Sequence, residues 1–301
     1  MEYNEHVEKL LDELESDTGI RFSIDDNNNN QSETIKKLSR LIHRFKGDEN
    51  RGFFFRQFLL GQLSRDEISE KRLLYHMDQN QPWAVFLIAF AKPYEPYALR
   101  VISSLFAPGA DHTVEMDRTH LVVIRQLKTL ATDEEIKEMA EAIMGTLGTE
   151  AMLSVKVSYD RCCEDLSGLP LSYQHCNQAM EVGRLFMEGD NIFGYHELGL
   201  GKLVFSLDPL VCREYLEDHL GDFDFKELDP ETRNTIRVFF DSGLSIAETA
   251  RNLYVHRNTL VYRIDKLQKQ TGLDIRRFED AITMNVAMLM DEYLKRYQED
   301  E

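Results

Sequence analysis

The chain has 301 residues, of which 43% are hydrophobic, and a formal net charge of −18. This is enough apolar sequence to bury a sizeable core in two or three domains. The longest apolar run, over residues 84–91, is far shorter than the roughly 18 residues that a membrane span requires. The acidic N-terminus also lacks the basic start of a secretory signal. We therefore expect a cytoplasmic protein that does not enter a membrane.

The four cysteines, at positions 162, 163, 176 and 212, form no CxxC motif and no metal-like spacing with histidine. Free thiols are the expected state in a reducing cytosol, and redox sensing by the adjacent pair Cys162 and Cys163 is the alternative. No GxSxG, GxxxxGKS or HExxH motif is present. The GxG at residues 199–201 lacks the third glycine of a dinucleotide site and is interpreted as a turn. The sequence therefore predicts a protein that is not an enzyme, with no cofactor and no metal site.

Residues 1–80 are predicted to be a mostly helical segment and a candidate dimerisation region. Apolar residues recur at helical spacing over 7–14 and 35–45, with a short strand predicted over 19–24. Residues 51–79 are also expected to be helical. Their cluster of large apolar side chains is interpreted as core or a dimer contact, and a ligand pocket is the alternative; it comprises Phe53, Phe54, Phe58 and Leu59.

Residues 81–220 change to alternating strands and helices. Strands are predicted over 83–91, 112–116, 120–127, 152–159 and 191–195, and helices over 96–106, 133–147 and 171–187. The second and third strands form a hairpin that turns at Asp117 and Arg118. This order is typical of an α+β domain with one mixed sheet.

Residues 221–230, GDFDFKELDP, are acidic and turn-prone. They are predicted to be a linker that lets an all-helical C-terminal domain, residues 231–301, move. The fold class is therefore multidomain: a helical N-terminal segment, a central α+β domain and a helical C-terminal domain.

Residues 244–267 carry the strongest functional signal, because they fit a helix-turn-helix. Ser245 is predicted to be the N-cap of the first helix, and Glu248, three residues later, completes a capping box. This helix is expected to end near residues 254–255, which form a tight connection. A second helix then starts at His256.

In the second helix Leu260, Ile264 and Leu267 recur at i, i+4 and i+7, so they are predicted to form its buried stripe. The exposed side is polar and basic, which is typical of a helix that reads the major groove. The first turn and a half is expected to meet base edges. The predicted readers are His256, Arg257, Asn258, Thr259 and Tyr262, and the predicted phosphate contacts are Arg263, Lys266 and Lys269. The alternative is an ordinary helical hairpin with a solvated basic face.

The charge distribution favours DNA binding by this segment. From Arg251 to Arg277 there are seven Lys or Arg residues against two acidic ones, which leaves a net charge of −23 on the rest of the chain. A positive field confined to one stretch is typical of a small DNA-binding unit on an acidic body.

The segment ETARNLYVHRNTLVYRIDKLQKQTGLDIRRFEDA resembles the C-terminal helix-turn-helix of bacterial regulators of purine catabolism (PucR) and of carbohydrate diacids (CdaR). The resemblance covers roughly residues 230–294, and its most specific pieces are HRNTLVYRI and TGLDI. It implies groove contacts from Arg257 and Tyr262, a backbone contact from Thr259, and binding as a dimer. A last helix is predicted from Phe278, with a role in closing this domain and in dimerisation; its apolar side comprises Ile282, Val286, Leu289 and Leu294.

The order of elements ahead of the helix-turn-helix is similar to the divergent GGDEF-like domain of the same regulators. The segments LPLSYQHCNQAMEVGR and YHELGLGKLVF carry this likeness. True cyclases hold nucleotide phosphates with a glycine pair in the hairpin turn, whereas residues 114–119 here read VEMDRT. Cyclase activity is therefore not expected. Glu115 and Asp117 alternate along the strand and are interpreted as solvated, with metal binding as the alternative.

These observations predict a bacterial transcriptional regulator that reads a two-fold operator through its C-terminal helix-turn-helix. Its expected partners are double-stranded DNA, a second copy of the chain and a small-molecule effector of unidentified chemistry. The N-terminal and central domains are expected to serve dimerisation or signal input. One alternative is a nucleotide-binding or nucleotide-cyclising protein that acts through the GGDEF-like domain. Another is a non-DNA interaction module built on a decayed helix-turn-helix.

Overall fold

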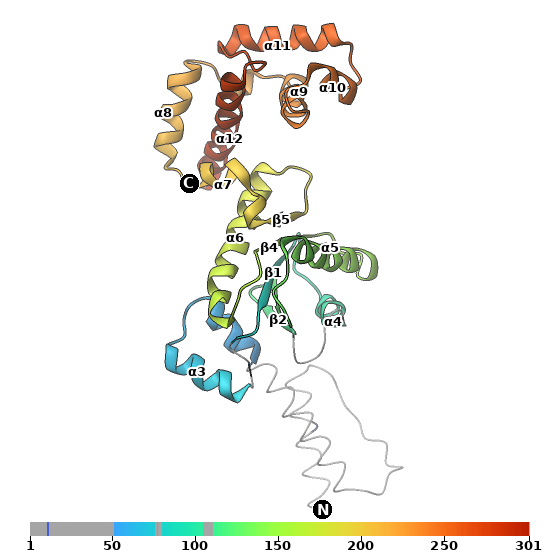
Figure 1. The fold of residues 1–301 in the computed structure, drawn as a ribbon, viewed down its shortest axis with the longest axis vertical. Coiled ribbons are helices and arrows are strands. Elements are labelled where there is room, and N and C mark those ends of the chain that lie inside the picture. Colours follow the sequence, from blue (N-terminus) through green and yellow to red (C-terminus); the bar gives the residue numbers. More distant parts are fainter. Residues whose placement is uncertain (1–10, 12–50, 76, 78–79, 105–110, 301) are drawn as a thin grey trace, which may run out of the picture. The chain divides into compact units, whose positions relative to one another are not determined.

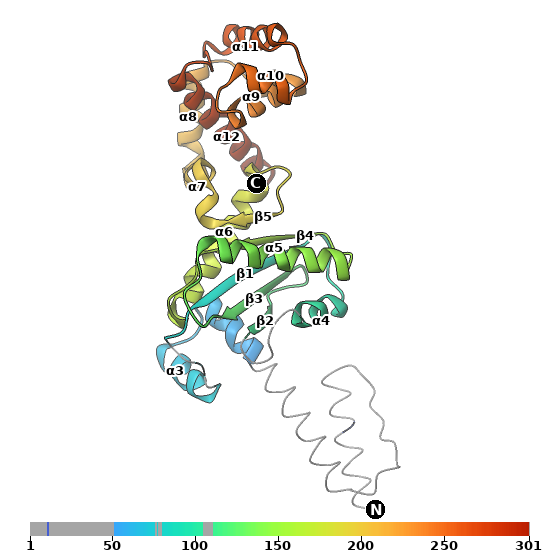
Figure 2. The ribbon, with the colours of Figure 1, turned by 45° about the vertical axis from the view of Figure 1, so that its right-hand side comes forward.

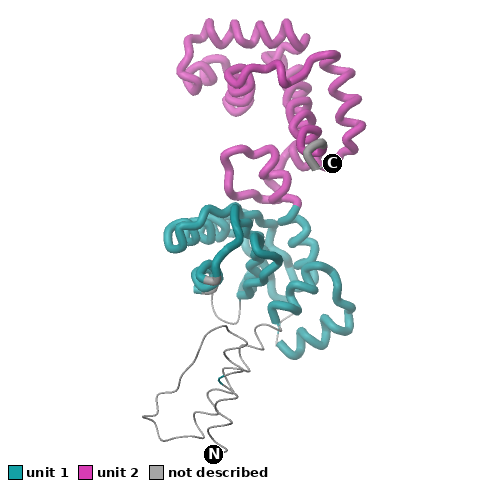
Figure 3. The backbone as a smooth tube through the Cα atoms, turned by 180° about the vertical axis from the view of Figure 1, so that it is seen from behind, with its two compact units in different colours: residues 1–177 teal, residues 178–301 magenta. Residues whose placement is uncertain are grey.

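The computed structural model describes residues 11, 51–75, 77, 80–104 and 111–300. The elements predicted between residues 7 and 45 lie outside the described residues, apart from the helical Leu11. The chain divides into two compact units, residues 1–177 and 178–301 (Figure 3), and each is described by itself. No helix among the described residues is long and apolar enough to cross a membrane.

The described part of the first unit begins with two helices, as predicted. Residues 51–59 form one helix, and α3 (Arg65–Leu74) forms the next. Three of the four members of the predicted aromatic cluster are buried, and only Phe53 is exposed. The cluster therefore belongs to the core, which supports the first of its two interpretations.

The sheet has the strand order β2-β3-β1-β4-β5 (Figures 1 and 2). The strands are β1 (Trp83–Phe90), β2 (Asp111–Glu115), β3 (His120–Gln126), β4 (Val155–Tyr159) and β5 (Ile192–Gly194). Strand β1 is central and all eight of its residues are buried, which is why its sequence is a continuous apolar run. It pairs antiparallel with β3 and β4, and β2 pairs antiparallel with β3 in the predicted hairpin.

Helices α4 (Pro96–Ser104), α5 (Asp133–Glu150) and α6 (Leu169–Phe186) confirm the three predicted helices of this region. Figure 2 shows α5 lying across the sheet. Its buried residues recur at helical spacing and face the sheet; they are Ile136, Ala140, Ile143 and Leu147.

The strand predicted from Met152 begins only at Val155. Met152 has φ 53°, in the left-handed region, and the N–H of Leu153 donates to the carbonyl of Leu147 at 3.1 Å. These two features close the end of α5, so residues 152–154 follow the helix end and do not belong to the strand.

The second unit contains α7 (Gly199–Phe205), α8 (Pro209–Leu220), α9 (Pro230–Asp241), α10 (Ile246–Asn252), α11 (Arg257–Thr271) and α12 (Phe278–Asp300). This confirms the helical C-terminal region. The GxG at residues 199–201, interpreted as a turn, instead starts α7. A Cβ on Gly201 would lie 2.8 Å from the ring of Phe186, so the glycine permits a close approach of the helix to that ring.

Residues 199–220 were predicted to belong to the central domain, but they pack within the second unit. Val204 of α7 and Cys212 of α8 form a buried cluster with Met290 and Leu294 of α12. The apolar side chains of α7 and α8 therefore contribute to the helical core rather than to the sheet.

The predicted linker, residues 221–230, is packed as well. Phe225 and Leu228 are buried in the main helical core of the second unit. The acidic residues that suggested a linker are helix caps: Asp224 caps a short 3-10 helix, and Asp229 caps α9 by accepting from the N–H of Thr232 at 2.7 Å. Turn-forming carboxylates here begin helices, so the segment is part of the domain.

Candidate nucleic-acid interface

Helix α11 is held by the stripe that its periodicity predicts. Leu260, Ile264 and Leu267 are buried, and they share a core with residues of the two preceding helices, among them Phe239 of α9 and Ala250 of α10. In Figures 1 and 2, α9 and α10 lie on the same side of α11. The other side of α11 is not covered by any described element of the second unit.

The start of α10 confirms Ser245 as an N-cap but corrects the capping box. The Ser245 hydroxyl accepts from the N–H of Glu248 at 3.3 Å. The reciprocal bond is absent, because the N–H of Ser245 donates to the carbonyl of Ser242 at 3.2 Å. Gly243 and Leu244 both adopt left-handed conformations, and the resulting tight turn brings the N–H of Ser245 to the carbonyl of Ser242. The Glu248 carboxylate is therefore not needed as a cap.

The turn between α10 and α11 closes as a Schellman motif. The N–H of Val255 donates to the carbonyl of Ala250 at 3.0 Å, and the N–H of Tyr254 donates to that of Arg251 at 3.1 Å. Leu253 and Val255 pack against the core, whereas the Tyr254 side chain between them is 96% exposed. The sequence located this turn but not the conformation of Tyr254.

The five predicted readers are all exposed at the N-terminal end of α11. His256 is the N-cap, because its Nδ1 accepts from the N–H of Asn258 at 3.2 Å. Arg257, Asn258 and Thr259 are exposed, and so is Tyr262 one turn further on. We call these five residues the recognition surface. The structure thus brings them together, and it gives His256 a capping role that the sequence analysis missed.

Arg263, predicted to contact phosphate, instead connects α11 to α9. Its side chain is only 15% exposed and forms an ion pair with Glu231, in the first turn of α9. It also donates a hydrogen bond of 3.1 Å to the hydroxyl of Thr235, a buried residue of the same helix. Glu231 and Thr235 thus both pair with the guanidinium, and we expect Arg263 to stabilise the domain.

The other cationic side chains of this region differ in whether they pair with a carboxylate. Lys266 is half-exposed and lies 3.5 Å from the carboxylate of Asp229, the N-cap of α9. Lys269, Arg257 and Arg251 are exposed, and within the described ranges none of them forms an ion pair. Arg251, in the last turn of α10, belongs to the basic stretch but is not among the predicted DNA contacts.

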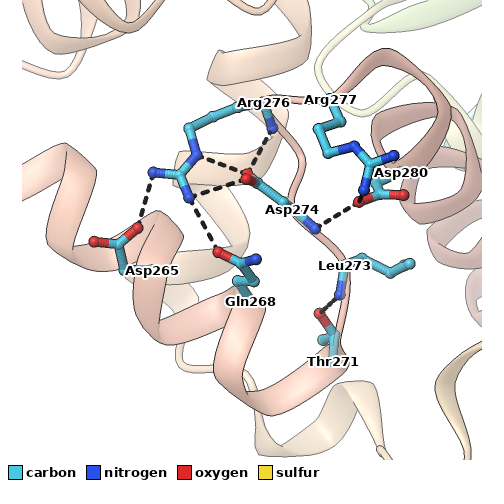
Figure 4. Close-up of polar contacts among 8 residues, drawn as sticks. All are labelled: Asp265, Gln268, Thr271, Leu273, Asp274, Arg276, Arg277 and Asp280. Carbon is cyan, nitrogen blue, oxygen red and sulfur yellow. Dashed lines mark hydrogen bonds and ion pairs between the residues drawn. The ribbon is translucent and has the colours of Figure 1, made fainter.

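The TGLDI motif sets the end of the recognition helix (Figure 4). Gly272 caps α11 with φ 77°, and Arg276 then reaches back to the helix. Its guanidinium donates to the carboxylates of Asp274 at 2.6 Å and Asp265 at 2.8 Å, and to the amide oxygen of Gln268 at 3.0 Å. The hydrogen bond from Arg276 holds the pKa of Asp274 below its usual value. This network fixes the C-terminal half of α11 to the connection that follows it.

Helix α12 begins at Phe278, as predicted, and the predicted apolar side is buried only in part. Phe278 and Ile282 are exposed, and Val286 and Leu289 are only partly buried. The buried positions are Ala281, Met284, Ala287, Met290 and Leu294. Leu294 is thus a buried member of the predicted side, and Val286 and Leu289 pack against the same buried cluster.

The hairpin of the GGDEF-like region is closed by side chains and not by glycines. One Asp117 oxygen accepts from the N–H groups of Thr119 and His120 at 2.6 and 2.9 Å. Glu115 accepts from the hydroxyl of Tyr94 at 3.0 Å, so the two carboxylates have separate partners. A pocket of about 650 Å³ lies at this turn; it is lined by Arg56, Pro93, Tyr94, Leu99, Glu115, Met116, Asp117 and Arg118.

The adjacent thiols of Cys162 and Cys163 are both free. Burial raises the pKa of the Cys163 thiol to about 11 and also raises that of Cys162. Both are therefore mainly protonated at neutral pH, a state in which thiols are poor nucleophiles. This argues against the redox-sensing alternative.

Comparison with known families agrees with these two regions. Residues 232–290 match the PucR C-terminal helix-turn-helix domain, and residues 60–182 match the GGDEF-like domain. The chain is therefore a helix-turn-helix protein that also carries a GGDEF-like domain, and the resemblance in its sequence is confirmed. The GGDEF-like match begins and ends earlier than the predicted central domain, residues 81–220.

Three curated relatives are similar to this chain. The carbohydrate diacid regulator of Escherichia coli (strain K12) is 26% identical over 53% of this chain and 41% of its own length. The purine catabolism regulatory protein of Bacillus subtilis (strain 168) is 25% identical over 46% of this chain and 26% of its own length. The protein YsfB of the same organism is 34% identical over 40% of this chain and 32% of its own length. The chain thus spans less than half of each relative.

Proposed function

We propose that this protein is a DNA-binding transcriptional regulator that places α11 in the major groove. The observation that carries the proposal is the recognition surface: five polar or aromatic residues, all exposed at the N-terminal end of α11, whose stripe of Leu260, Ile264 and Leu267 is buried. The names of the two regulators among its relatives support the same role. The proposed role is regulatory and not enzymatic, and contact with the chromosome of a bacterium implies a cytoplasmic location.

Each residue of the interface has a proposed contact. Arg257 suits guanine and Asn258 suits adenine, because each side chain can form two hydrogen bonds with that base. Tyr262 lies one turn further along the groove, and Thr259 contacts the backbone. Lys269 and Arg251 neutralise phosphates, since both are exposed and carry no ion pair among the described residues.

Binding is proposed to occur as a homodimer on a two-fold operator. Two copies of α11 must then lie one helical turn of DNA apart, about 34 Å, which a symmetric dimer provides. Sedimentation of the full chain at micromolar concentration is expected to show a dimer. A monomer, both with and without operator DNA, would rule out this arrangement.

The test of the function is retention of genomic DNA. Fragments of the organism's own genome are incubated with the purified chain at low salt, bound fragments are sequenced, and their affinity is compared with random DNA as salt rises. Arg257→Ala is expected to abolish the preference for selected fragments over random DNA. Arg213→Ala, an exposed arginine of α8, is the matched control and should leave the preference unchanged. If no fragment is retained, the non-DNA interaction module becomes the better explanation.

A second candidate function, nucleotide binding by the GGDEF-like domain, is favoured by the pocket at the hairpin. Arg56 and Arg118 line it, and neither forms an ion pair within the residues that the structure describes. Guanidinium groups pair well with phosphate and carboxylate groups, so an anionic effector would also fit. Calorimetry with GTP and ATP, with Mg²⁺ or Mn²⁺, tests this candidate. Binding that Arg118→Ala weakens would support it, and the absence of binding to either nucleotide would end it.

A further inference from the structure

Three consecutive helices of the second unit end on a residue in the left-handed conformation. The residue is Gly243 after α9, with φ 60°, and Gly272 after α11, with φ 77°. After α10 it is Tyr254, with φ 56°. Glycine is the usual residue there because it has no Cβ to clash with the backbone, so a tyrosine costs stability at this position.

Packing does not offset that cost. The Tyr254 side chain is 96% exposed and forms no hydrogen bond or ring contact in the described part of the chain. The bonds that close the turn come from backbone N–H groups, which a glycine would supply equally well. The contacts with the core come from Leu253 and Val255 on either side. The tyrosine side chain therefore adds no hydrogen bond, ring contact or buried surface to the described part of the domain.

Tyr254 occupies a place where a side chain can meet DNA. The turn leads directly into the N-terminal end of α11 (Figures 1 and 2), and His256, two residues later, caps that helix. When the first turn of a recognition helix enters the major groove, the residues just before it lie at the groove edge, beside the phosphates. Tyrosine hydroxyls are among the groups that donate to phosphate oxygens.

We propose that the hydroxyl of Tyr254 donates a hydrogen bond to a backbone phosphate of the bound DNA and thereby orients the recognition helix. This proposal rests on the proposed function, because it adds a contact to the same interface. Backbone strain retained with an exposed side chain is typical of residues kept for binding and not for stability.

A contact of this kind differs from a base contact and from a charged contact. Because phosphate carries no sequence information, its loss weakens binding to selected and random DNA by the same factor. Because the phenol is uncharged, its loss leaves the slope of log affinity against log salt unchanged. Loss of Arg257, in contrast, reduces the preference for selected DNA.

The experiment uses the full chain and fluorescent duplexes, one of random sequence and one selected from the genome. Tyr254→Phe and Tyr254→Gly are each expected to weaken binding to both duplexes by about tenfold, the effect of one hydrogen bond to a charged group. Tyr254→Gly should keep or raise the Tm, because glycine relieves the strain.

Met152→Gly is the matched control. Met152 also follows the end of a helix in the left-handed conformation, with φ 53°, and is 90% exposed. It lies in the first unit, away from the helix-turn-helix in the sequence. This variant should also keep or raise the Tm, and it should leave DNA binding unchanged.

The possible outcomes separate this inference from the proposed function. If both Tyr254 variants bind like the parent chain, the inference is overturned, while the function stands as long as Arg257→Ala loses discrimination. A loss seen only with Tyr254→Gly would overturn the hydrogen bond from the hydroxyl. A variant that loses Tm together with affinity would show a structural role instead. If the parent chain itself binds neither duplex, the proposed function fails first and this inference fails with it.

Discussion

The guanidinium of Arg263, in the middle of α11, pairs with the carboxylate of Glu231 at the start of α9. The two residues are 32 positions apart in the sequence, and the pair joins the first and third helices of the helix-turn-helix region. The ion pair fixes α11 to α9, and the buried stripe packs α11 against the core. Two residues of similar charge on one helix, Arg263 and Lys269, therefore have different expected roles.

We expect Arg263→Ala to lower the free energy of unfolding by about 1–2 kcal/mol, because it removes a shielded ion pair and a hydrogen bond to Thr235. Lys269→Ala should change it by less than about 0.5 kcal/mol. The salt dependence of DNA binding should respond in the opposite way, with a slope reduced by about one only for Lys269→Ala. Urea denaturation and salt titrations measure both. A lower slope with unchanged stability for Arg263→Ala would contradict its structural role.

The half-formed capping box distinguishes Ser245 from Glu248. Ser245→Ala removes the side-chain bond that caps the N–H of Glu248 and should cost about 1 kcal/mol. Glu248→Ala removes no capping bond, and only a few tenths of a kcal/mol are expected from the lost interaction with the helix dipole. Thermal denaturation of the two variants measures these losses, and the Tm should fall further for Ser245→Ala. Equal losses would indicate that the full capping box forms in solution.

Asp274 is expected to make the second unit sensitive to acid. Its pKa is held below the usual value by Arg276, so it contributes stability above the unfolded pKa of about 3.9. That contribution is lost as the pH falls through the lower, folded pKa. Asp274→Asn should therefore be less stable than the parent chain at pH 7, and the difference should shrink at about pH 3. The midpoints of urea denaturation of both chains at pH 7 and at about pH 3 measure this difference in stability. Asp218→Asn, at an exposed residue of α8, is the control for the loss of one surface carboxylate.

Gly183 tests the close packing between α6 and β5. A Cβ at this position would lie 2.3 Å from ring atoms of Phe193, which is fully buried. Gly183→Ala is therefore expected to cost about 1–3 kcal/mol, although alanine favours helices. Gly148→Ala in α5, where a Cβ meets nothing within 4 Å, should instead stabilise the chain by about 0.5–1 kcal/mol. If the two variants shift the Tm alike, the close contact with Phe193 is wrong.

The buried stripe of α11 and its polar surface could be predicted because both follow from local periodicity. A helix that packs on one side must bury Leu260, Ile264 and Leu267 together, whatever the rest of the chain does. The pairing of Arg263 and Lys266 could not be predicted, since their carboxylate partners lie at the start of α9, 32 and 37 residues earlier in the sequence. No local pattern indicates which cation meets which carboxylate.

The errors at the edges of the C-terminal domain have two physical causes. Asp224 and Asp229 were interpreted as linker residues, but the same side chains that favour turns also cap helices. In α12 the predicted apolar side included Ile282, which is exposed, and omitted Ala281 and Ala287, which are buried. Composition identifies turns and apolar faces in general. The space left between neighbouring helices decides which residues fill it.

Four of the seven cationic side chains between Arg251 and Arg277 are paired with carboxylates: Arg263, Lys266, Arg276 and Arg277. Such a side chain must leave its partner before it can displace counterions from DNA. The proposed regulator would therefore gain little attraction to the bulk of a chromosome, which offers phosphates but no matching bases. Attraction that does not depend on sequence would then come from the exposed cations that form no ion pair among the described residues, Arg251, Arg257 and Lys269, and the choice of site would depend on short-range fit.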